Sequence, residues 1–309
     1  MAIDIRDAFF DEIYDIAAKD KNVMFVTADA DAFSIRRYKK DFPDQFINVG
    51  VQEQNMVLIA TGLALAGKKV FVYSIIPFIT MRCYEHIKAN ICSMNLDVTI
   101  IGCGAGLSFS KDGPTHHAIH DIGVMRVMPD MKIYNPSDAE SPKDCAQKVY
   151  NNSTPAYVRI DKGIFPELYV DGCSDANIIR NFDKTVIIST GYMTHTALEV
   201  AEELDCGLID SVRISPLPEN LFELIRERSY GHTQQIITIE ENSITGGIGS
   251  AVSEFITDHD LPIKLKRIAL EDKQYFEYGD RKWLHEEYGI SANKIISRLR
   301  SEIGEYYVD

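Results

Sequence analysis

The sequence predicts an α/β protein of two domains, each a mostly parallel sheet with helices on both faces. With 309 residues, the chain is long enough for two hydrophobic cores of ordinary size. Helical and strand patterns alternate through the first 160 residues, which is typical of parallel strands joined by helices that cover both faces of a sheet. The same alternation resumes after residue 183 on a smaller scale.

The first domain is predicted to begin with an amphipathic helix, because apolar residues recur every three or four positions from Ile5 to Ile16. A later helix is predicted to open at Ser137, where Glu140 three residues further on would complete a capping box. The other expected elements are strands at 23–26, 46–49, 70–73, 98–101, 131–134 and 156–160, and helices at 52–66 and 82–92.

Periodicity is lost between about residues 163 and 183, where Pro166 and Gly172 favour a connector or a hairpin. The second domain then shows apolar or amphipathic runs at 185–189, 195–204, 207–209, 221–226, 236–239, from 246 onward, and at 263–268. The predicted boundaries are therefore a first domain at 1–165, a linker at 166–183 and a second domain at 184–309.

Charge and composition narrow the classes of partner. The formal net charge is -14 and no stripe of Lys or Arg interrupts the acidic background, which argues against nucleic acid and against an anionic membrane surface. The start of the chain carries acids and has neither a basic leader nor an uninterrupted apolar core, and no later run approaches the length of a membrane span. We expect a cytoplasmic protein whose partners are small molecules or proteins.

The cysteines are irregularly spaced and form no CxxC pair, so we expect reduced structural thiols rather than a zinc or redox site. They are Cys83, Cys92, Cys103, Cys145, Cys173 and Cys206.

Ligands of open parallel sheets bind beyond the carboxyl ends of the strands, because loops and helix N-termini converge there. That rule selects the segments 28–31, 50–53, 74–78 and 104–117. Glu53 lies in the first turn of a predicted helix, where an acid is also favoured simply by the helix dipole. The loop at 111–117 has an Asp-Gly-Pro turn directly before His116 and His117, and the spacing of His116 and His120 would suit a metal if this segment were helical.

Two glycine clusters allow more than one interpretation. Residues 102–106 follow a predicted strand, but the third glycine of a dinucleotide fingerprint would fall on Leu107. The cluster at 245–250 opens a helix in the second domain, where it suits either an anion site or close packing of strand and helix.

Taken together, these motifs resemble the transketolase family. Residues 46–56 (FINVGVQEQNM), followed by the 112–116 loop (DGPTH), resemble its pyrimidine-binding domain. Residues 239–243 (IEENS) with 246–249 (GGIG) resemble its C-terminal domain. The resemblance covers nearly the whole chain, in the right order, and implies a thiamine diphosphate enzyme.

One part of the family pattern is missing. The family holds the diphosphate and its metal with a Gly-Asp-Gly signature followed by Asn, whereas here the only Gly-Asp pair, Gly279-Asp280, is followed by Arg281. The resemblance therefore implies a split enzyme, in which an N-terminal transketolase subunit supplies the domain that binds the diphosphate with Mg²⁺ or Ca²⁺. Family active sites form between subunits, so we expect a heterotetramer with two copies of each chain.

The resemblance also assigns roles to residues around the cofactor. Glu53 matches the glutamate that hydrogen-bonds the aminopyrimidine ring and activates the cofactor. Phe78 lies where the family stacks an aromatic ring on the pyrimidine, and Asp29 matches an aspartate of the cofactor pocket. A core Phe and a helix-capping Asp are the structural alternatives for the last two.

Four residues match substrate-binding positions of the family. Asp112 and His116 match the residues that contact the hydroxyl and carbonyl oxygens of a ketose donor, and we count His116 as catalytic as well. Arg6 and Lys162 match cations for a sugar phosphate, with Lys162 in place of the more usual Arg, which removes a bidentate fork. Gly104 stands where the family often has a phosphate-contacting His, so the phosphate site is altered.

The main functional hypothesis is the C-terminal subunit of a thiamine diphosphate-dependent transketolase. Such an enzyme is a transferase that moves a two-carbon ketol unit from a ketose or its phosphate to an aldose or its phosphate. One alternative is a subunit like 1-deoxyxylulose-5-phosphate synthase or another enzyme that uses 2-oxo acids. An alternative of another class is a non-catalytic structural or regulatory subunit, which would be under no need to keep Glu53 and His116.

Overall fold

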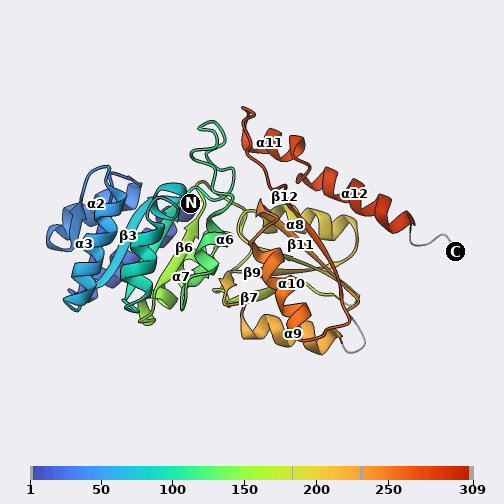
Figure 1. Ribbon diagram of the computed structural model, residues 1–309, viewed down its shortest axis with the longest axis horizontal. Helices are drawn as coiled ribbons and strands as arrows, with labels where there is room; N and C mark the ends of the chain where they lie inside the picture. The colour runs from blue at the N-terminus through green and yellow to red at the C-terminus, as the bar shows by residue number, and fades with distance from the viewer. Residues whose placement is uncertain (1–2, 183, 230–232, 306–309) are drawn as a thin grey trace.

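The computed structural model describes residues 3–182, 184–229 and 233–305. Two sheets lie side by side, the first built mainly from the N-terminal half of the chain and the second from the C-terminal half (Figure 1). The first sheet has the strand order β10-β5-β6-β4-β3-β1-β2, and the second has the order β12-β11-β8-β9-β7. In each sheet one edge strand is antiparallel and the other pairings are parallel, so the predicted fold class is confirmed.

Alternating side chains of the first sheet face two helical layers. In β1, Val23 and Phe25 join the core under α1 and α7, while Met24 and Val26 join the core under α3. The strands are β1 (Val23–Thr27), β2 (Phe46–Asn48), β3 (Lys69–Ile75), β4 (Val98–Cys103), β5 (Lys132–Tyr134) and β6 (Ala156–Ile160). The helices are α1 (Ile5–Lys19), α2 (Phe33–Asp41), η1 (Pro43–Gln45), α3 (Glu53–Leu65), α4 (Ile76–Ile79), α5 (Tyr84–His86), η2 (Ile87–Cys92), α6 (Asp121–Arg126) and α7 (Ser141–Asn151).

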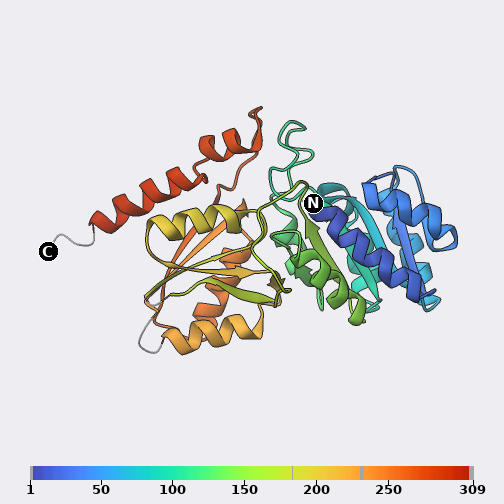
Figure 2. The same cartoon turned by 180° about the vertical axis from the view of Figure 1, so that it is seen from behind.

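The second sheet is also covered on both faces, with α8, α11 and α12 on one side and α9 and α10 on the other (Figure 2). Its strands are β7 (Ala176–Arg180), β8 (Thr185–Ser189), β9 (Gly207–Ser211), β11 (Gln235–Ser243) and β12 (Lys264–Leu270). Its helices are α8 (Met193–Glu203), α9 (Glu219–Ser229), α10 (Ile248–Asp258), α11 (Arg281–Glu287) and α12 (Ala292–Glu305). Within the described ranges, no helix has the length and the apolar composition needed to cross a membrane.

Two strands depart from the sequence expectation. The segment predicted as a linker contains β7, which pairs antiparallel with β9 at the edge of the second sheet. The short β10 (Arg213–Ser215) follows β9 in the chain but pairs antiparallel with β5, so the C-terminal half of the chain completes the first sheet. Long-range pairing of this kind leaves no periodic signal in a three-residue strand.

Two helix predictions were wrong in detail. The helix expected to open at Ser137 begins at Ser141, because the carboxylate of Asp138 accepts the backbone N–H of Ser141 at 2.9 Å and Pro142 occupies the first turn. The helix expected at 82–92 is a turn followed by the short α5 and the π-helix η2. The helices α2, α11 and α12 were not anticipated.

A buried carboxylate ties the two halves together. Asp210, at the end of β9, accepts hydrogen bonds from the hydroxyls of Ser137 at 2.9 Å, Tyr169 at 2.5 Å and Thr194 at 2.8 Å. Burial raises the pKa of this carboxyl to about 6, although the three hydroxyls oppose that effect. The folded protein therefore retains a proton that the unfolded chain releases at lower pH.

We expect Asp210→Asn to remove a pH dependence of stability. The pKa of Asp210 in the folded protein lies above its value near 3.8 in the unfolded chain. The protonated carboxyl therefore stabilises the fold fully below pH 3.8, and this stabilisation is lost as the pH rises through about 6. A shift of this size corresponds to about 3 kcal/mol. Melting temperatures between pH 4.5 and 7.5 should show a smaller decline for Asp210→Asn than for the unmodified protein. The exposed Asp171→Asn should match the unmodified protein, and an equal decline in all three would contradict the expectation.

Candidate active site

Glu53 begins α3 at the carboxyl end of the first sheet. It follows a turn in which Gly50 has a positive φ of 74°, a conformation that favours glycine. Although its side chain is only 3% exposed, it is not surrounded by apolar groups alone: Nη1 of Arg82 donates to Oε2 at 2.7 Å, and the hydroxyl of Ser74 donates to Oε1 at 3.4 Å. Arg82 is 44% exposed, so the pair joins a buried carboxylate to the surface.

Phe78 lies next to this ion pair. It sits in the short α4, directly after β3, and is partly buried. The guanidinium carbon of Arg82 lies 4.2 Å from the centroid of the Phe78 ring, a cation–π geometry. The ring of His116 also contacts the Phe78 ring, at 5.0 Å between centroids and with an interplanar angle of 70°. Glu53, Phe78 and His116 thus form one group, in which Arg82 links Glu53 to Phe78 and Phe78 contacts His116.

His116 and Asp112 are carried by the loop between β4 and α6. Backbone hydrogen bonds fold the loop into successive turns: Asp112 N–H donates to Phe109 at 3.0 Å, and His116 N–H donates to Gly113 at 2.9 Å. Asp112 is exposed at the tip of the loop, and Nδ1 of His116 lies 3.0 Å from the hydroxyl of Thr115. Because the segment is not helical, the i, i+4 metal spacing does not arise, and no group of three or more potential ligands gathers within the described part of the chain.

Lys162 approaches the same loop from the end of β6. Its ammonium lies 5.6 Å from the centroid of the Phe109 ring, and that ring in turn lies 6.0 Å from the ring of His116. Gly104 makes room for this arrangement, because a Cβ at that position would lie 2.1 Å from the Phe109 ring. The ring of Phe109 is therefore close both to His116 and to the exposed ammonium of Lys162.

Arg6 lies at the same end of the sheet but already has a partner. Its guanidinium donates to both carboxylate oxygens of Asp4, at 3.0 and 3.2 Å, and Nη1 lies 3.9 Å from Sγ of Cys103. The structure thus places Arg6 near the end of β4 with its charge balanced by Asp4.

Asp29 lies further along the edge of the sheet, after β1. It has a positive φ of 58° and exchanges hydrogen bonds with Asn48, whose side-chain oxygen also accepts the N–H of Gly50 at 3.0 Å. Asp29 does not cap α2, because the residue before that helix is Ala32 and makes no side-chain cap. Its contacts link it instead to the turn that precedes Glu53.

The remaining motifs have internal partners. In the second domain, the carboxyl group of Glu240 accepts the N–H groups of Ile248 and Gly249, both at 2.9 Å, so a side chain of the protein itself occupies the N-terminus of α10. Asp280, of the Gly279-Asp280 pair, caps α11 by accepting the N–H of Trp283 at 2.9 Å.

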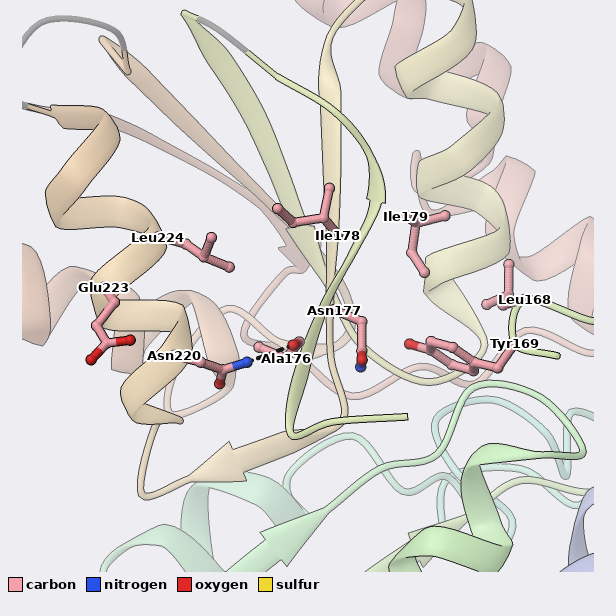
Figure 3. A pocket seen from close by; sticks show the side chains of 9 residues that line it. All are labelled: Leu168, Tyr169, Ala176, Asn177, Ile178, Ile179, Asn220, Glu223 and Leu224. Atoms are coloured by element: carbon pink, nitrogen blue, oxygen red, sulfur yellow. Dashed lines mark hydrogen bonds between the residues drawn. The ribbon is translucent and has the colours of Figure 1, made fainter. Parts of the chain in front are cut away.

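A hollow of about 560 Å³ lies elsewhere, between β7 and α9 (Figure 3). Side chains of Tyr169, Ile178, Asn220 and Leu224 line it. None of the predicted site residues lines this hollow.

Two family models match the chain over most of its length. The model for the transketolase pyrimidine-binding domain matches residues 1–167, and the model for the transketolase C-terminal domain matches residues 174–295. The chain belongs to the transketolase family. The predicted resemblance is therefore confirmed, and membership in the transketolase family implies the use of thiamine diphosphate.

Individual relatives support the same transketolase assignment. The chain is 34% identical over 297 residues to an apulose-4-phosphate transketolase subunit of Actinobacillus succinogenes, covering 91% of this chain and 93% of that protein. It is 32% identical over 296 residues to the 1-deoxy-D-xylulose-5-phosphate synthase of Hahella chejuensis, covering 94% of this chain but only 45% of that longer protein. A solved split-gene transketolase, described as an inactive β4 tetramer, superimposes with a TM-score of 0.84 at 28% identity, covering 97% of this chain and 98% of that one.

The residues present suit the pyrimidine end of the transketolase cofactor. Glu53 offers a carboxylate at the N-terminus of a helix, and the partly exposed ring of Phe78 lies beside it. Two exposed apolar side chains flank these residues in the chain: Val51 lies two positions before Glu53, and Met81 lies directly before Arg82. Arg82 and Phe109 were missed by sequence reasoning, because nothing in the spacing of the chain relates them to Glu53 or His116.

Proposed function

We propose that this chain is the C-terminal subunit of a split transketolase that transfers a two-carbon ketol unit from a ketose or ketose phosphate to an aldose or aldose phosphate. The observation that carries the proposal is the grouping of Glu53, Phe78 and His116 at one edge of the sheet. Arg82 links Glu53 to Phe78, and Phe78 contacts His116. The buried carboxylate and the aromatic ring suit the pyrimidine of the cofactor. The imidazole on a polar loop suits the oxygens of a polyol substrate.

Thiamine diphosphate, when bound, supplies the carbon nucleophile and the electron sink for carbon–carbon bond cleavage. Glu53 would hold and share a proton at the pyrimidine ring, and Phe78 would stack against that ring. His116 and Asp112 would bind the oxygens of the donor, and His116 would also move a proton at them. Lys162 and Arg6 would meet the terminal phosphate, and Asp29 would complete the cofactor pocket through its link to the turn before Glu53.

The diphosphate and its Mg²⁺ or Ca²⁺ would be held by an N-terminal partner subunit. Supporting this, α3 and the segments that flank Glu53 and Arg82 expose large apolar side chains, which subunit interfaces commonly cover. They are Val51, Leu58, Leu65 and Met81. The related split-gene structure, an inactive tetramer of one chain type, supports both self-association and the need for a second chain. We propose a heterotetramer with two copies of each subunit.

Reconstitution with the partner subunit tests the proposal. With thiamine diphosphate and Mg²⁺ present, the complex should cleave D-xylulose 5-phosphate and pass the two-carbon unit to an aldose phosphate, and neither subunit alone should do so. Sedimentation of the mixture should show one species containing both chains. A complex that assembles but turns over no ketose would contradict the transfer activity and would favour the structural or regulatory alternative.

A second candidate is chemistry like that of 1-deoxy-D-xylulose-5-phosphate synthase, which the relative from Hahella chejuensis supports. The same complex separates the two, because this alternative requires pyruvate as donor and releases carbon dioxide. Turnover of pyruvate with no turnover of D-xylulose 5-phosphate would replace the first proposal with the second.

A further inference from the structure

The loop that carries Asp112 and His116 is closed at its base by two facing backbone segments. Gly106 and Ala118 exchange both backbone hydrogen bonds, at 3.1 and 2.8 Å, and so form a neck for residues 107–117. In Figures 1 and 2 this loop projects from the edge of the first sheet beside α11. Four contacts of the neck determine how the loop is held.

Three of these contacts come from the second domain. The backbone N–H of Ser243, at the end of β11, donates to the carbonyl of Ile119 at 2.7 Å. Arg281, in the first turn of α11, donates to the carbonyl of Ala105 at 3.4 Å. The carboxylate of Glu241 packs against Gly106 so closely that a Cβ on that glycine would lie 2.0 Å from Oε2.

The fourth contact comes from β6 of the first sheet. Nη2 of Arg159 donates to the carbonyl of Ala118 at 2.8 Å and reaches the carbonyl of Glu241 at 3.4 Å. The neck therefore lies between a strand of the first sheet and the end of β11.

Arg281 is the residue that joins these parts. Its guanidinium pairs with both carboxylate oxygens of Glu241 and with Oδ2 of Asp161, the latter at 2.7 Å, and it lies 3.8 Å from the ring of Tyr192. Asp161 directly precedes Lys162 and accepts its backbone N–H at 2.7 Å. One side chain of the second domain thus contacts two of the three segments that carry predicted substrate residues, all but the segment of Arg6.

Arg281 lies buried between two carboxylates, Asp161 and Glu241. Burial alone would raise the pKa of Glu241, but Arg281 and His285 hold the pKa of that carboxyl well below its usual range. Burial alone would lower the pKa of Arg281, and Asp161 and Glu241 reverse that effect. The cluster is therefore a fixed ionic contact, since neither partner changes charge near neutral pH.

We infer that Arg281 is a positioning residue of the active site. Through Arg281 and Glu241, the second domain fixes the position of the loop that carries Asp112 and His116, and also the position of Lys162. The role of the 107–117 loop in substrate binding rests on the proposed function. The link between the second domain and that loop rests on geometry alone. It gives the C-terminal domain a part in substrate binding although it contributes none of the predicted site residues.

Hydrogen–deuterium exchange of Arg281→Lys, in the complex with the partner subunit, tests the inference. Lysine keeps the charge but lacks the fork that spans Glu241, Asp161 and Ala105 together. We expect amides within 107–117 to exchange about tenfold faster, with the melting temperature nearly unchanged. The matched control is Arg126→Lys, since Arg126 makes a separate contact between the domains, to Glu254 at 2.6 Å and to the carbonyl of Gly246 at 3.0 Å. That control should leave exchange in the loop unchanged.

Kinetics give a second readout. Arg281→Lys should raise KM for D-xylulose 5-phosphate about tenfold and leave the half-saturating concentration of thiamine diphosphate unchanged, because Glu53 and Phe78 do not contact the cluster. Gly106→Ala, which forces a methyl group into the space of the Glu241 carboxylate, should loosen the same amides.

Unchanged exchange across 107–117 in Arg281→Lys would overturn the inference, and so would equal loosening by Arg126→Lys, which would indicate domain docking in general. A complex that turns over no ketose would contradict the proposed function alone, because the exchange measurement does not depend on turnover.

Discussion

Glu53→Gln is expected to lower kcat of the reconstituted complex by about 10²–10⁴-fold, the usual contribution of a positioned proton-transfer group. Glutamine keeps the size of the side chain and can still accept a hydrogen bond from Ser74, but it cannot take up or share the proton. The measurement is steady-state transfer from D-xylulose 5-phosphate at saturating thiamine diphosphate, with melting curves to confirm that the variant is folded.

Glu85→Gln provides the matched control for that experiment. Glu85 is exposed on α5, three residues after Arg82, so the same chemical change there should leave kcat unchanged. Activity within a few fold of normal in Glu53→Gln would contradict the role assigned to Glu53. Equal losses in both variants would point to damage of the α4–α5 region rather than to lost proton transfer.

Arg159→Met is expected to lower the free energy of unfolding by about 3–5 kcal/mol, because it leaves a buried carboxylate without its cation. Arg159 is 4% exposed and Asp121 is 0% exposed, with Nε of the former 2.9 Å from Oδ2 of the latter. The hydroxyl of Tyr157 also donates to that oxygen, at 2.7 Å, but a single hydroxyl does not neutralise the charge. Urea unfolding at pH 7 measures the loss.

The double variant Arg159→Met with Asp121→Asn separates the charge from the packing. Removing both charges should restore most of the lost stability, since replacing a whole buried pair costs far less than breaking it. A double variant as unstable as Arg159→Met would show that the lost hydrogen bonds to Ala118 and Glu241 matter more than the unpaired carboxylate.

The sequence predicted the parallel strands well, because their β-branched runs are buried on both faces and bounded by turn residues. Val98–Cys103 and Ala156–Ile160 are buried at every position, which is the pattern that central strands produce. Helix starts were less predictable, because Ser137 and Asp138 are both suitable capping residues and only the position of Pro142 in the folded first turn favours the second.

Site residues that directly follow a strand were predictable from the sequence, whereas residues that reach the site through long-range contacts were not. Glu53, Phe78 and His116 follow three different strand ends, so the rule that ligands bind at that edge was enough to group them. Arg82 reaches Glu53 across 29 positions from a segment without a regular helix, and no periodic pattern indicates such a contact. Arg281 lies further still, in a helix that sequence patterns did not reveal.

The pairing of β10 with β5 limits how the two halves of this chain can be exchanged among relatives. Val212 lies in the core of the first sheet, and Arg213 and Ser215 pair with Tyr134 and Ile133. A chimera joined anywhere in 166–183 would bring a foreign β10 to a native β5, or leave the edge of β5 bare as a template for unwanted strand pairing. A workable hybrid must therefore take residues 212–215 from the same parent as the N-terminal half. Strand pairing, rather than the linker between the domains, decides which residues can be exchanged.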